Sequence, residues 1–294
     1  MTDPPLTVPD QPSPAAPNAA PPDERAPRQR PSLRAMLRAI GRSWFAAVQF
    51  LTRIPMPSGW LGDEPHGADL RLAAAFFPCV GILIGLITGT AIWLCLHLWP
   101  AWVAVGIGVA MEALLTGALH EDALADFCDA FGGGWTREDV LRILDDSRVG
   151  SFGVLGLVLA VLLRAGTLAS LEPGLLVTAA VASASAGRWA MLPAMAALPP
   201  VAGRESLAQH VGRLVTARDV LLGGLGMLAG VAPLVWISPW RMAVAAVGLG
   251  IVVTGFVAYV HRRIGGMTGD CLGCLCYLAQ LWVLLCASAG WPTV

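Results

Sequence analysis

The sequence predicts an all-α, polytopic integral membrane protein, a helical bundle with about seven transmembrane helices. Of its 294 residues, 56% are hydrophobic and only 13% are charged, an apolar share above that of an ordinary soluble domain. Runs of about 20 apolar residues, the length that spans a bilayer core, recur along most of the chain. Each run is predicted to be a helix, because backbone groups in lipid must be hydrogen-bonded within the segment.

The N-terminal segment has a different composition. Residues 1–33 are rich in Pro and Ala and carry several arginines, a composition that cannot bury a core and predicts a disordered tail. Residues 34–294 form the predicted transmembrane catalytic domain. Its first part, residues 44–51, follows Arg34, Arg38 and Arg42, and is expected to be a short helix at the membrane surface.

Seven apolar runs are predicted to cross the membrane: 72–98, 101–119, 152–171, 175–198, 220–237, 242–260 and 272–289. The positive-inside rule places the Arg-rich N-terminus in the cytoplasm. Alternation then puts the loops 122–150, 199–219 and 261–270, with eight arginines, on the cytoplasmic side. The short turns on the other side hold only Arg241.

Two features of the apolar runs predict helix contacts. Gly81, Gly85 and Gly89 repeat every four residues, which would let a neighbouring helix approach closely. Glu112, Arg164 and Arg188 lie well inside apolar runs, where an ionisable group is costly unless it is paired or hydrated. An ion pair of Glu112 with Arg164 or Arg188 is therefore expected.

Three aspartates follow the second apolar run, in the stretch LHEDALADFCDAFGGG. On a helix Asp122, Asp126 and Asp129 share one face, within roughly 60° of one another. Like charges so close repel each other, and a divalent cation removes the conflict. Oxygen ligands suit Mg²⁺, which is usually coordinated by a few carboxylates, by substrate phosphate and by water. The alternative is a solvated helix end, with Gly132–Gly134 only ending the helix.

Two further polar stretches follow. Thr136 and Asp139 predict a capping box that opens a short helix over residues 137–144, which ends in DDSRVGSFG. There Arg148 could bind a phosphate, and Asp146 could be a metal ligand or could orient Arg148. The alternative is that Asp146 and Arg148 form only a solvated pair at the end of the helix. The stretch GGMTGD, residues 265–270, has the composition of a phosphate or metal loop before the last helix, although such turns are common.

These motifs together predict a metal-assisted transfer at a membrane surface. Acids would hold Mg²⁺ and arginine would bind phosphate, while no Ser/His/Asp or Cys/His arrangement indicates covalent catalysis. Direct attack by a substrate hydroxyl on a phosphate needs mainly positioning and charge stabilisation from the protein. The expected surroundings are the lipid bilayer, and no nucleic-acid partner is expected.

At these residues the sequence resembles the cobalamin synthase family, also called adenosylcobinamide-GDP ribazoletransferase. The resemblance covers the chain from about residue 44 to its end. It rests on FLTRIPMP (50–57), FFPCVGILIG (76–85), LHEDALADFCDAFGGG (119–134), LRILDDSRVGSFGVLGL (141–157), Arg188 in ASAGRWAML, and GGMTGDCLG (265–273). The stretches occur in the family's order, and the ordered combination is far more specific than any one of them.

The resemblance implies a Mg²⁺-dependent enzyme of the bacterial inner membrane, with its active site facing the cytoplasm. It would join α-ribazole, or its 5′-phosphate, to adenosylcobinamide-GDP and release GMP. A homo-oligomer and an association with other enzymes of the cobalamin pathway are both compatible with it. The implied catalytic residues are Asp122, Asp126, Asp129 and Arg148, the first three as metal ligands, and the implied substrate-binding residues are Asp146, Ser147, Arg188, Thr268 and Asp270.

The sequence departs from the family pattern at three places. Ala123 and Ala130 stand where the family has Gly, and Ser206-Leu207-Ala208 stands for Gly-Leu-Gly; the added methyl groups would tighten the approach to a large substrate. Two other classes remain as alternatives. One is another Mg²⁺-dependent membrane phosphotransferase or prenyltransferase acting on a diphosphate. The other is a transporter, which broken helices in matched halves would support, for example at Pro193 and Pro233.

Overall fold

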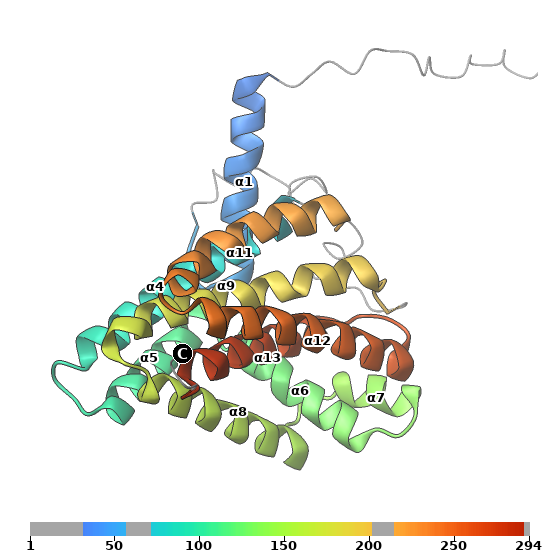
Figure 1. Cartoon of the computed structure of the whole chain (residues 1–294). Coiled ribbons are helices and arrows are strands. Elements are labelled where there is room, and N and C mark those ends of the chain that lie inside the picture. The colour runs from blue at the N-terminus through green and yellow to red at the C-terminus, as the bar shows by residue number, and fades with distance from the viewer. Residues whose placement is uncertain (1–31, 57–71, 202–214, 291–294) are drawn as a thin grey trace, which may run out of the picture.

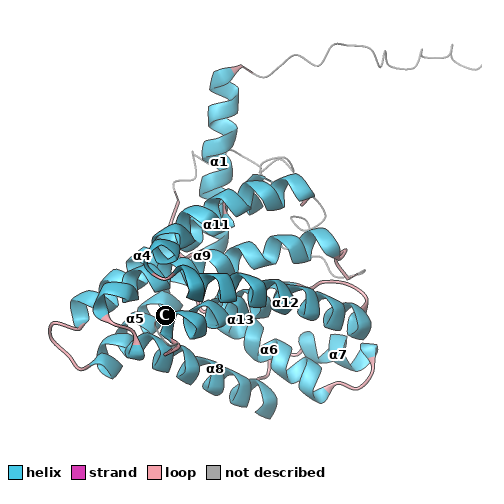
Figure 2. Cartoon of the chain, in the orientation of Figure 1, coloured by secondary structure: helices cyan, strands magenta, loops and turns pink. Residues whose placement is uncertain are grey.

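The computed structural model describes residues 32–56, 72–201 and 215–290, and in these ranges the regular secondary structure is helical (Figure 2). The helices are α1 (Leu33–Leu51), α4 (Phe77–Cys95), α5 (Ala101–Thr116), α6 (Leu119–Gly133), α7 (Arg137–Leu144), α8 (Ser151–Ser170), α9 (Pro173–Ala197), α11 (Ala217–Ile237), α12 (Pro239–Ile264) and α13 (Gly269–Ser288). An isolated β-bridge pairs Pro200 with Met267. The all-α prediction is confirmed.

The helices confirm the predicted spans with one difference. Helices α4, α8, α9, α11, α12 and α13 are each long and apolar enough to cross a membrane. The expected span over residues 101–119 is instead a bent pair, in which α5 and α6 meet at 89° and pass the same test only together. Among the described residues, six single helices could therefore cross the membrane, and the bent pair could form a seventh span.

Helices α9 and α13 form the centre of the bundle (Figure 1). Most of the apolar stretch of each is buried within the protein, whereas a third or less of the stretch in α8, α11 and α12 is buried. Exposed Leu and Val side chains on α8 and α11 include Leu155, Leu162, Leu221 and Leu225. Apolar surface of this kind is stable facing lipid tails, so these outer helices present the lipid-facing side of the bundle.

The glycine repeat has the predicted packing role. An added Cβ at Gly81 or Gly85 would lie against the backbone of α9, at Ala184 and at Val181 respectively. At Gly89 it would approach the Val177 Cα to 3.0 Å. The three glycines thus bring α4 directly onto the central helix α9, as expected of small residues at helix interfaces in membranes.

The bend between α5 and α6 has a local cause. Gly117 and Ala118 both adopt left-handed backbone conformations, with φ of 69° and 55°. Left-handed φ is costly for alanine, so neighbouring contacts must hold it. The Arg53 amide donates a 2.7 Å hydrogen bond to the Leu115 carbonyl, and the Arg53 side chain occupies the space that a Cβ at Gly117 would need.

Other sequence expectations have mixed outcomes. The short surface helix expected at residues 44–51 is the second half of α1, whose N-cap is Ser32. Pro193 and Pro233 lie inside α9 and α11 and do not interrupt them, so the helix breaks suggested for a transporter are not found at these prolines. Nearly all of the expected tail, and Ser206-Leu207-Ala208, lie outside the described residues.

Candidate functional site

Helix α6 carries the three aspartates at one end of the bundle. Their exposure falls along the helix, since Asp122 is exposed, Asp126 is partly buried and Asp129 is buried. The helix ends at Gly133, followed by the C-cap Gly134, as the glycine run predicted. The three acids therefore lie on one helix in three different environments.

Asp129 is bound to the start of α8. Its Oδ2 accepts a 2.7 Å hydrogen bond from the Gly150 amide, and its Oδ1 accepts a 2.8 Å bond from the Gly153 amide. These are amides at the N-cap and third position of α8, which have no partner within that helix. A Cβ at either glycine would collide with the Asp129 carboxylate, so the two glycines allow the contact.

Asp126 lies among other carboxylates. It is close enough to Asp122, Asp129 and Asp270 to be repelled by the charge of each. Asp270 is in the first turn of α13, where the Thr268 hydroxyl accepts a 3.2 Å hydrogen bond from the Cys271 amide and so caps the helix. The structure thus brings the DxxxDxxD and TGD motifs together, although Asp126 and Asp270 are 144 residues apart in the sequence.

Helices α6 and α13 meet at a pair of small residues. A Cβ at Gly273 would collide with the Cβ of Ala123, which is buried. The extra methyl group of Ala123, one of the departures from the family pattern, is therefore accommodated against a glycine of the TGD segment. It points into the helix interface and away from the solvent that a substrate would occupy.

The carboxylates at the acidic end suit a hard divalent cation whose other ligands come from the substrate and from water. Within the described ranges, no three His, Cys, Asp or Glu side chains converge closely enough to enclose a metal ion on their own. Mg²⁺ commonly needs only one or two carboxylates, with substrate phosphates and waters completing its coordination. Asp122 and Asp126, with Asp270 nearby, meet this requirement, whereas both Asp129 oxygens already accept backbone hydrogen bonds.

The DDSR segment presents an oriented arginine. Asp146 accepts hydrogen bonds from the Arg148 backbone amide at 3.1 Å and from its Nη2 at 2.7 Å. These bonds lower the pKa of Asp146 to about 2 and raise the pKa of Arg148. The Arg148 side chain is 86% exposed, and Ser147 beside it is exposed. Of the two roles considered for Asp146, the geometry favours orienting Arg148.

Helix α7 joins the acidic helix to this segment. Its predicted bounds are confirmed, as is the capping box of Thr136 and Asp139. The Arg137 Nε donates to the Ile264 carbonyl at 3.0 Å, and the Arg263 Nη2 donates to the Gly134 carbonyl at 2.6 Å. These two arginines, to which the sequence analysis gave no role, hold the end of α6 and the start of α7 against the end of α12.

The loop between α12 and α13 is fixed on its other side. The Met267 amide donates to the Pro199 carbonyl at 2.9 Å, and the Val201 amide donates to the Met267 carbonyl at 3.2 Å. Gly265 ends α12 with a φ of 75°, a conformation that glycine adopts without strain. The segment that carries Thr268 and Asp270 is therefore held against the end of α9.

The predicted ion pair is confirmed for one of its two candidate partners. Arg164 Nη2 lies 2.7 Å from Glu112 Oε2, with both side chains about 95% buried. The same guanidinium lies 3.5 Å from Glu121. Glu121 belongs to the same buried cluster, because its side chain is only 14% exposed.

Arg188 lies in the centre of the bundle. It is fully buried, and its Nη1 donates to Gln280 Oε1 at 3.0 Å and to the Ala184 carbonyl at 3.3 Å. It therefore connects α9 with α13. The expected contact of Arg188 with the substrate stays a prediction.

The fold and the site define a class: a polytopic membrane protein with clustered carboxylates and an oriented arginine at one end of its bundle. Residues 43–288 match the cobalamin-5-phosphate synthase family. This match spans most of the chain. The chain therefore belongs to this family. No solved structure matches the chain.

Individual relatives support the same assignment. A protein of Ralstonia pickettii named adenosylcobinamide-GDP ribazoletransferase is 40% identical over 252 residues, which cover 84% of this chain and 95% of the relative. A protein of the same name from Leptothrix cholodnii is 37% identical and covers 85% and 94% of the two chains. One from Shewanella baltica is 35% identical and covers 81% and 90%.

Proposed function

We propose that the acidic end of the bundle joins adenosylcobinamide-GDP to ribazole with the help of Mg²⁺. The chain is a membrane transferase of cobalamin biosynthesis, of the family whose members carry the name of this reaction. The observation that supports this location best is the convergence of Asp122, Asp126 and Asp270 from two helices beside the Arg148 segment. Both α-ribazole and its 5′-phosphate suit an open, charged site of this kind.

Two kinds of side chain meet the diphosphate in this proposal. Asp122 and Asp126 are the metal ligands, with Asp270 completing the acidic group. Arg148 contacts a phosphate oxygen and keeps its orientation through Asp146. Ser147 and Thr268 are the further substrate contacts in this proposal, although Thr268 already caps α13. Mg²⁺, when bound, would neutralise charge on the diphosphate and on the departing GMP.

The reaction requires positioning more than covalent help. A ribose hydroxyl oxygen of ribazole forms a bond to the phosphorus nearest the cobinamide, the bond from that phosphorus to the leaving oxygen of GMP breaks, and the hydroxyl proton is lost to water. Phosphoryl chemistry of this type depends on alignment and on charge stabilisation. The residues of this chain supply the alignment, since α6, the Arg148 segment and the start of α13 are fixed to one another by the contacts described above.

Asp129 has a positioning role in this proposal and is not assigned as a metal ligand. Its carboxylate holds the Gly150 and Gly153 amides, two and five residues after Arg148. These two hydrogen bonds link α6 to the segment that carries Arg148. A small displacement between catalytic groups is costly, since about 1 Å can reduce a rate by roughly 10²-fold.

The acidic end faces the cytoplasm of a bacterial inner membrane in this proposal. Arg137, Arg142, Arg148, Arg262 and Arg263 all belong to segments at the acidic end, whereas Arg241 lies at the start of α12, at the other end. Cytoplasmic loops carry such an excess of arginine. Nucleotide substrates are soluble and would reach the site from that side. Self-association and association with other enzymes of the pathway stay predictions.

An activity assay tests the proposal. Membrane vesicles that contain the protein should convert adenosylcobinamide-GDP and α-ribazole to a cobalamin product when Mg²⁺ is added. Asp122→Asn and Asp126→Asn should each lower the rate by about 10²-fold or more, as for loss of a group that stabilises transition-state charge. Glu138→Gln, on the exposed surface of α7, is the matched control and should keep the rate. Full activity in both aspartate variants would contradict the proposed site.

A further inference from the structure

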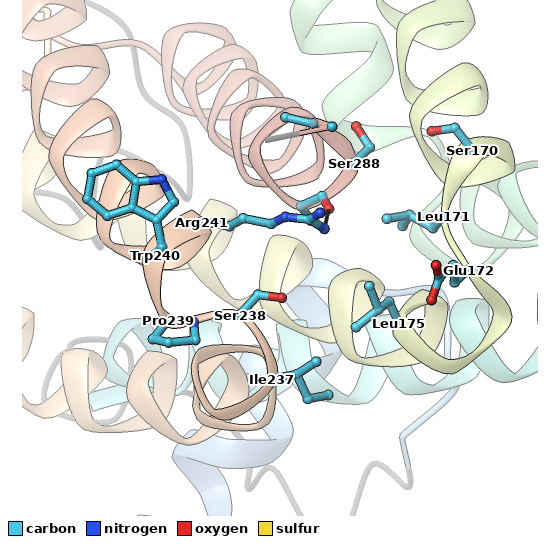
Figure 3. A pocket seen from close by; sticks show the side chains of 13 residues that line it. Ser170, Leu171, Glu172, Leu175, Ile237, Ser238, Pro239, Trp240, Arg241 and Ser288 are labelled. Atoms are coloured by element: carbon cyan, nitrogen blue, oxygen red, sulfur yellow. Dashed lines mark hydrogen bonds between the residues drawn. The ribbon is translucent and has the colours of Figure 1, made fainter. Parts of the chain in front are cut away.

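A second candidate site lies at the end of the bundle opposite the aspartates. A pocket of about 560 Å³ opens where α8, α11 and α13 end and where α9 and α12 begin (Figure 3). Helix α8 runs from the Asp129 contact at Gly150 to this pocket at Ser170, and its 20 residues span about 30 Å. The pocket is therefore separate from the proposed active site.

The pocket carries one cationic and one anionic side chain. In Figure 3 the Arg241 guanidinium reaches into the pocket, and Glu172 lies on the side formed by α8 and α9. Arg241 Nη1 donates to the Ala287 carbonyl at 2.8 Å, and within the described parts of the chain this is its one recorded polar contact. A guanidinium has five N–H donors, so most remain for a ligand. No ion pair joins Arg241 to Glu172 among these residues.

Helix ends add charge of both signs. Helices α9 and α12 begin here, at Pro173 and Pro239, and the N-terminus of a helix attracts anions. Helices α8, α11 and α13 end here, and a helix C-terminus attracts cations. The hydroxyl groups of Ser238 and Ser288 also line the pocket. Such surroundings suit a ligand that carries a phosphate and an ammonium group.

Two apolar grooves adjoin the pocket, one along α8 and one along α11. One, of about 370 Å³, shares Ser170 with the pocket and runs along α8 past Leu159, Leu162 and Leu163. The other, of about 590 Å³, shares Pro239 with it and runs along α11 past Leu228, Val235 and Trp236. Both lie on outer, lipid-facing helices. A polar pocket between two apolar grooves has the shape of a headgroup with two acyl chains.

We propose that this end of the bundle binds one zwitterionic diacyl phospholipid of the phosphatidylethanolamine type. The phosphate lies by Arg241 and the start of α12, and the ammonium group lies by Glu172. The two acyl chains lie in the grooves along α8 and α11. Trp236 and Trp240, both exposed, lie at the level where tryptophan is enriched in membrane proteins, between headgroups and tails.

Native mass spectrometry of the full-length protein in mild detergent tests this site. The probes are dioleoyl phosphatidylethanolamine, dioleoyl phosphatidylglycerol and water-soluble glycerophosphoethanolamine. The wild type should retain one phosphatidylethanolamine, at least tenfold more than phosphatidylglycerol. Arg241→Gln should lower this retention about tenfold, whereas Arg262→Gln, an exposed arginine at the other end of the bundle, should not.

A charge reversal gives a second readout that does not depend on loss of binding. Glu172→Lys should shift the preference from phosphatidylethanolamine to the anionic phosphatidylglycerol. The proposal is overturned if the two lipids are retained equally by the wild type, or if Arg241→Gln and Glu172→Lys bind as the wild type does. Equal binding of glycerophosphoethanolamine would also overturn it, because the grooves would then contribute nothing. None of these results bears on the transferase site.

Discussion

The Asp129 carboxylate accepts a 2.8 Å hydrogen bond from the backbone amide of Gly153, a residue at the start of a different helix. This contact joins α6, which carries the acids, to α8, which directly follows the arginine-bearing segment. It also explains why glycine stands at position 153, where any Cβ would collide with the carboxylate.

Gly153→Ala should separate Asp129 from the start of α8. The added methyl group must displace the carboxylate, and with it the Arg148 segment, so the transferase rate should fall by roughly 10²-fold, the usual cost of misplacing a catalytic group by about 1 Å. Gly255→Ala is the control, because nothing lies within 4 Å of a Cβ at that position on α12. Equal rates in the two variants, measured in vesicles, would show that Asp129 does not position the segment.

Arg148→Ala should lower the rate more than Asp146→Asn. The first change removes the proposed phosphate contact, which is worth about 10²–10³-fold, whereas the second only frees Arg148 to adopt other orientations. Arg142→Gln, an exposed arginine on the neighbouring helix, should have little effect. Steady-state rates at saturating substrate decide the order, and a larger effect of Asp146→Asn would indicate a direct role for that acid.

The pH dependence of the rate should not come from Asp146. Its pKa is lowered to about 2 by the hydrogen bonds from Arg148, so its favourable contribution is present above its ordinary pKa of 3.8. That contribution is lost only as the pH falls from about 4 towards 2. Rate profiles between pH 5 and 9 should therefore have the same shape in the wild type and in Asp146→Asn. An acid limb that disappears in the variant would contradict this.

Glu112→Gln should destabilise the bundle without touching the proposed site. Removing one partner of a buried pair leaves the Arg164 charge uncompensated, a loss of about 3–5 kcal/mol in typical cases. Glu121 lies 3.5 Å from the same guanidinium, and its charge would offset part of this loss of stability. Thermal unfolding in detergent measures the effect, with Glu138→Gln as the exposed control. An unchanged Tm would mean that the pair contributes no stability.

The sequence predicted the helical fold well, because apolar length is a direct consequence of bilayer thickness. It also predicted the helix at residues 137–144, since a capping box is a local signal. The bend between α5 and α6 was missed. It depends on left-handed backbone conformations at Gly117 and Ala118 and on Arg53, which donates to the Leu115 carbonyl, a contact distant in sequence that no local pattern contains.

The site was predicted only in part for the same reason. Helical spacing places Asp122, Asp126 and Asp129 on one helix, but it does not reveal that Asp129 faces the start of α8. Gly150 and Gly153 were the available signal, since two glycines after Arg148 indicate a close backbone approach. The burial of Arg188 against Gln280 could not be read from either residue alone.

Binding of Mn²⁺ in place of Mg²⁺, followed by electron paramagnetic resonance, tests the central claim most directly. In the presence of adenosylcobinamide-GDP, the wild type should bind one Mn²⁺ per chain that Mg²⁺ displaces. Asp126→Asn should lose this binding, whereas Asp139→Asn, in the capping box of α7, should retain it. Equal Mn²⁺ binding in Asp126→Asn and the wild type would contradict the account, because the acids of α6 would then not hold the metal.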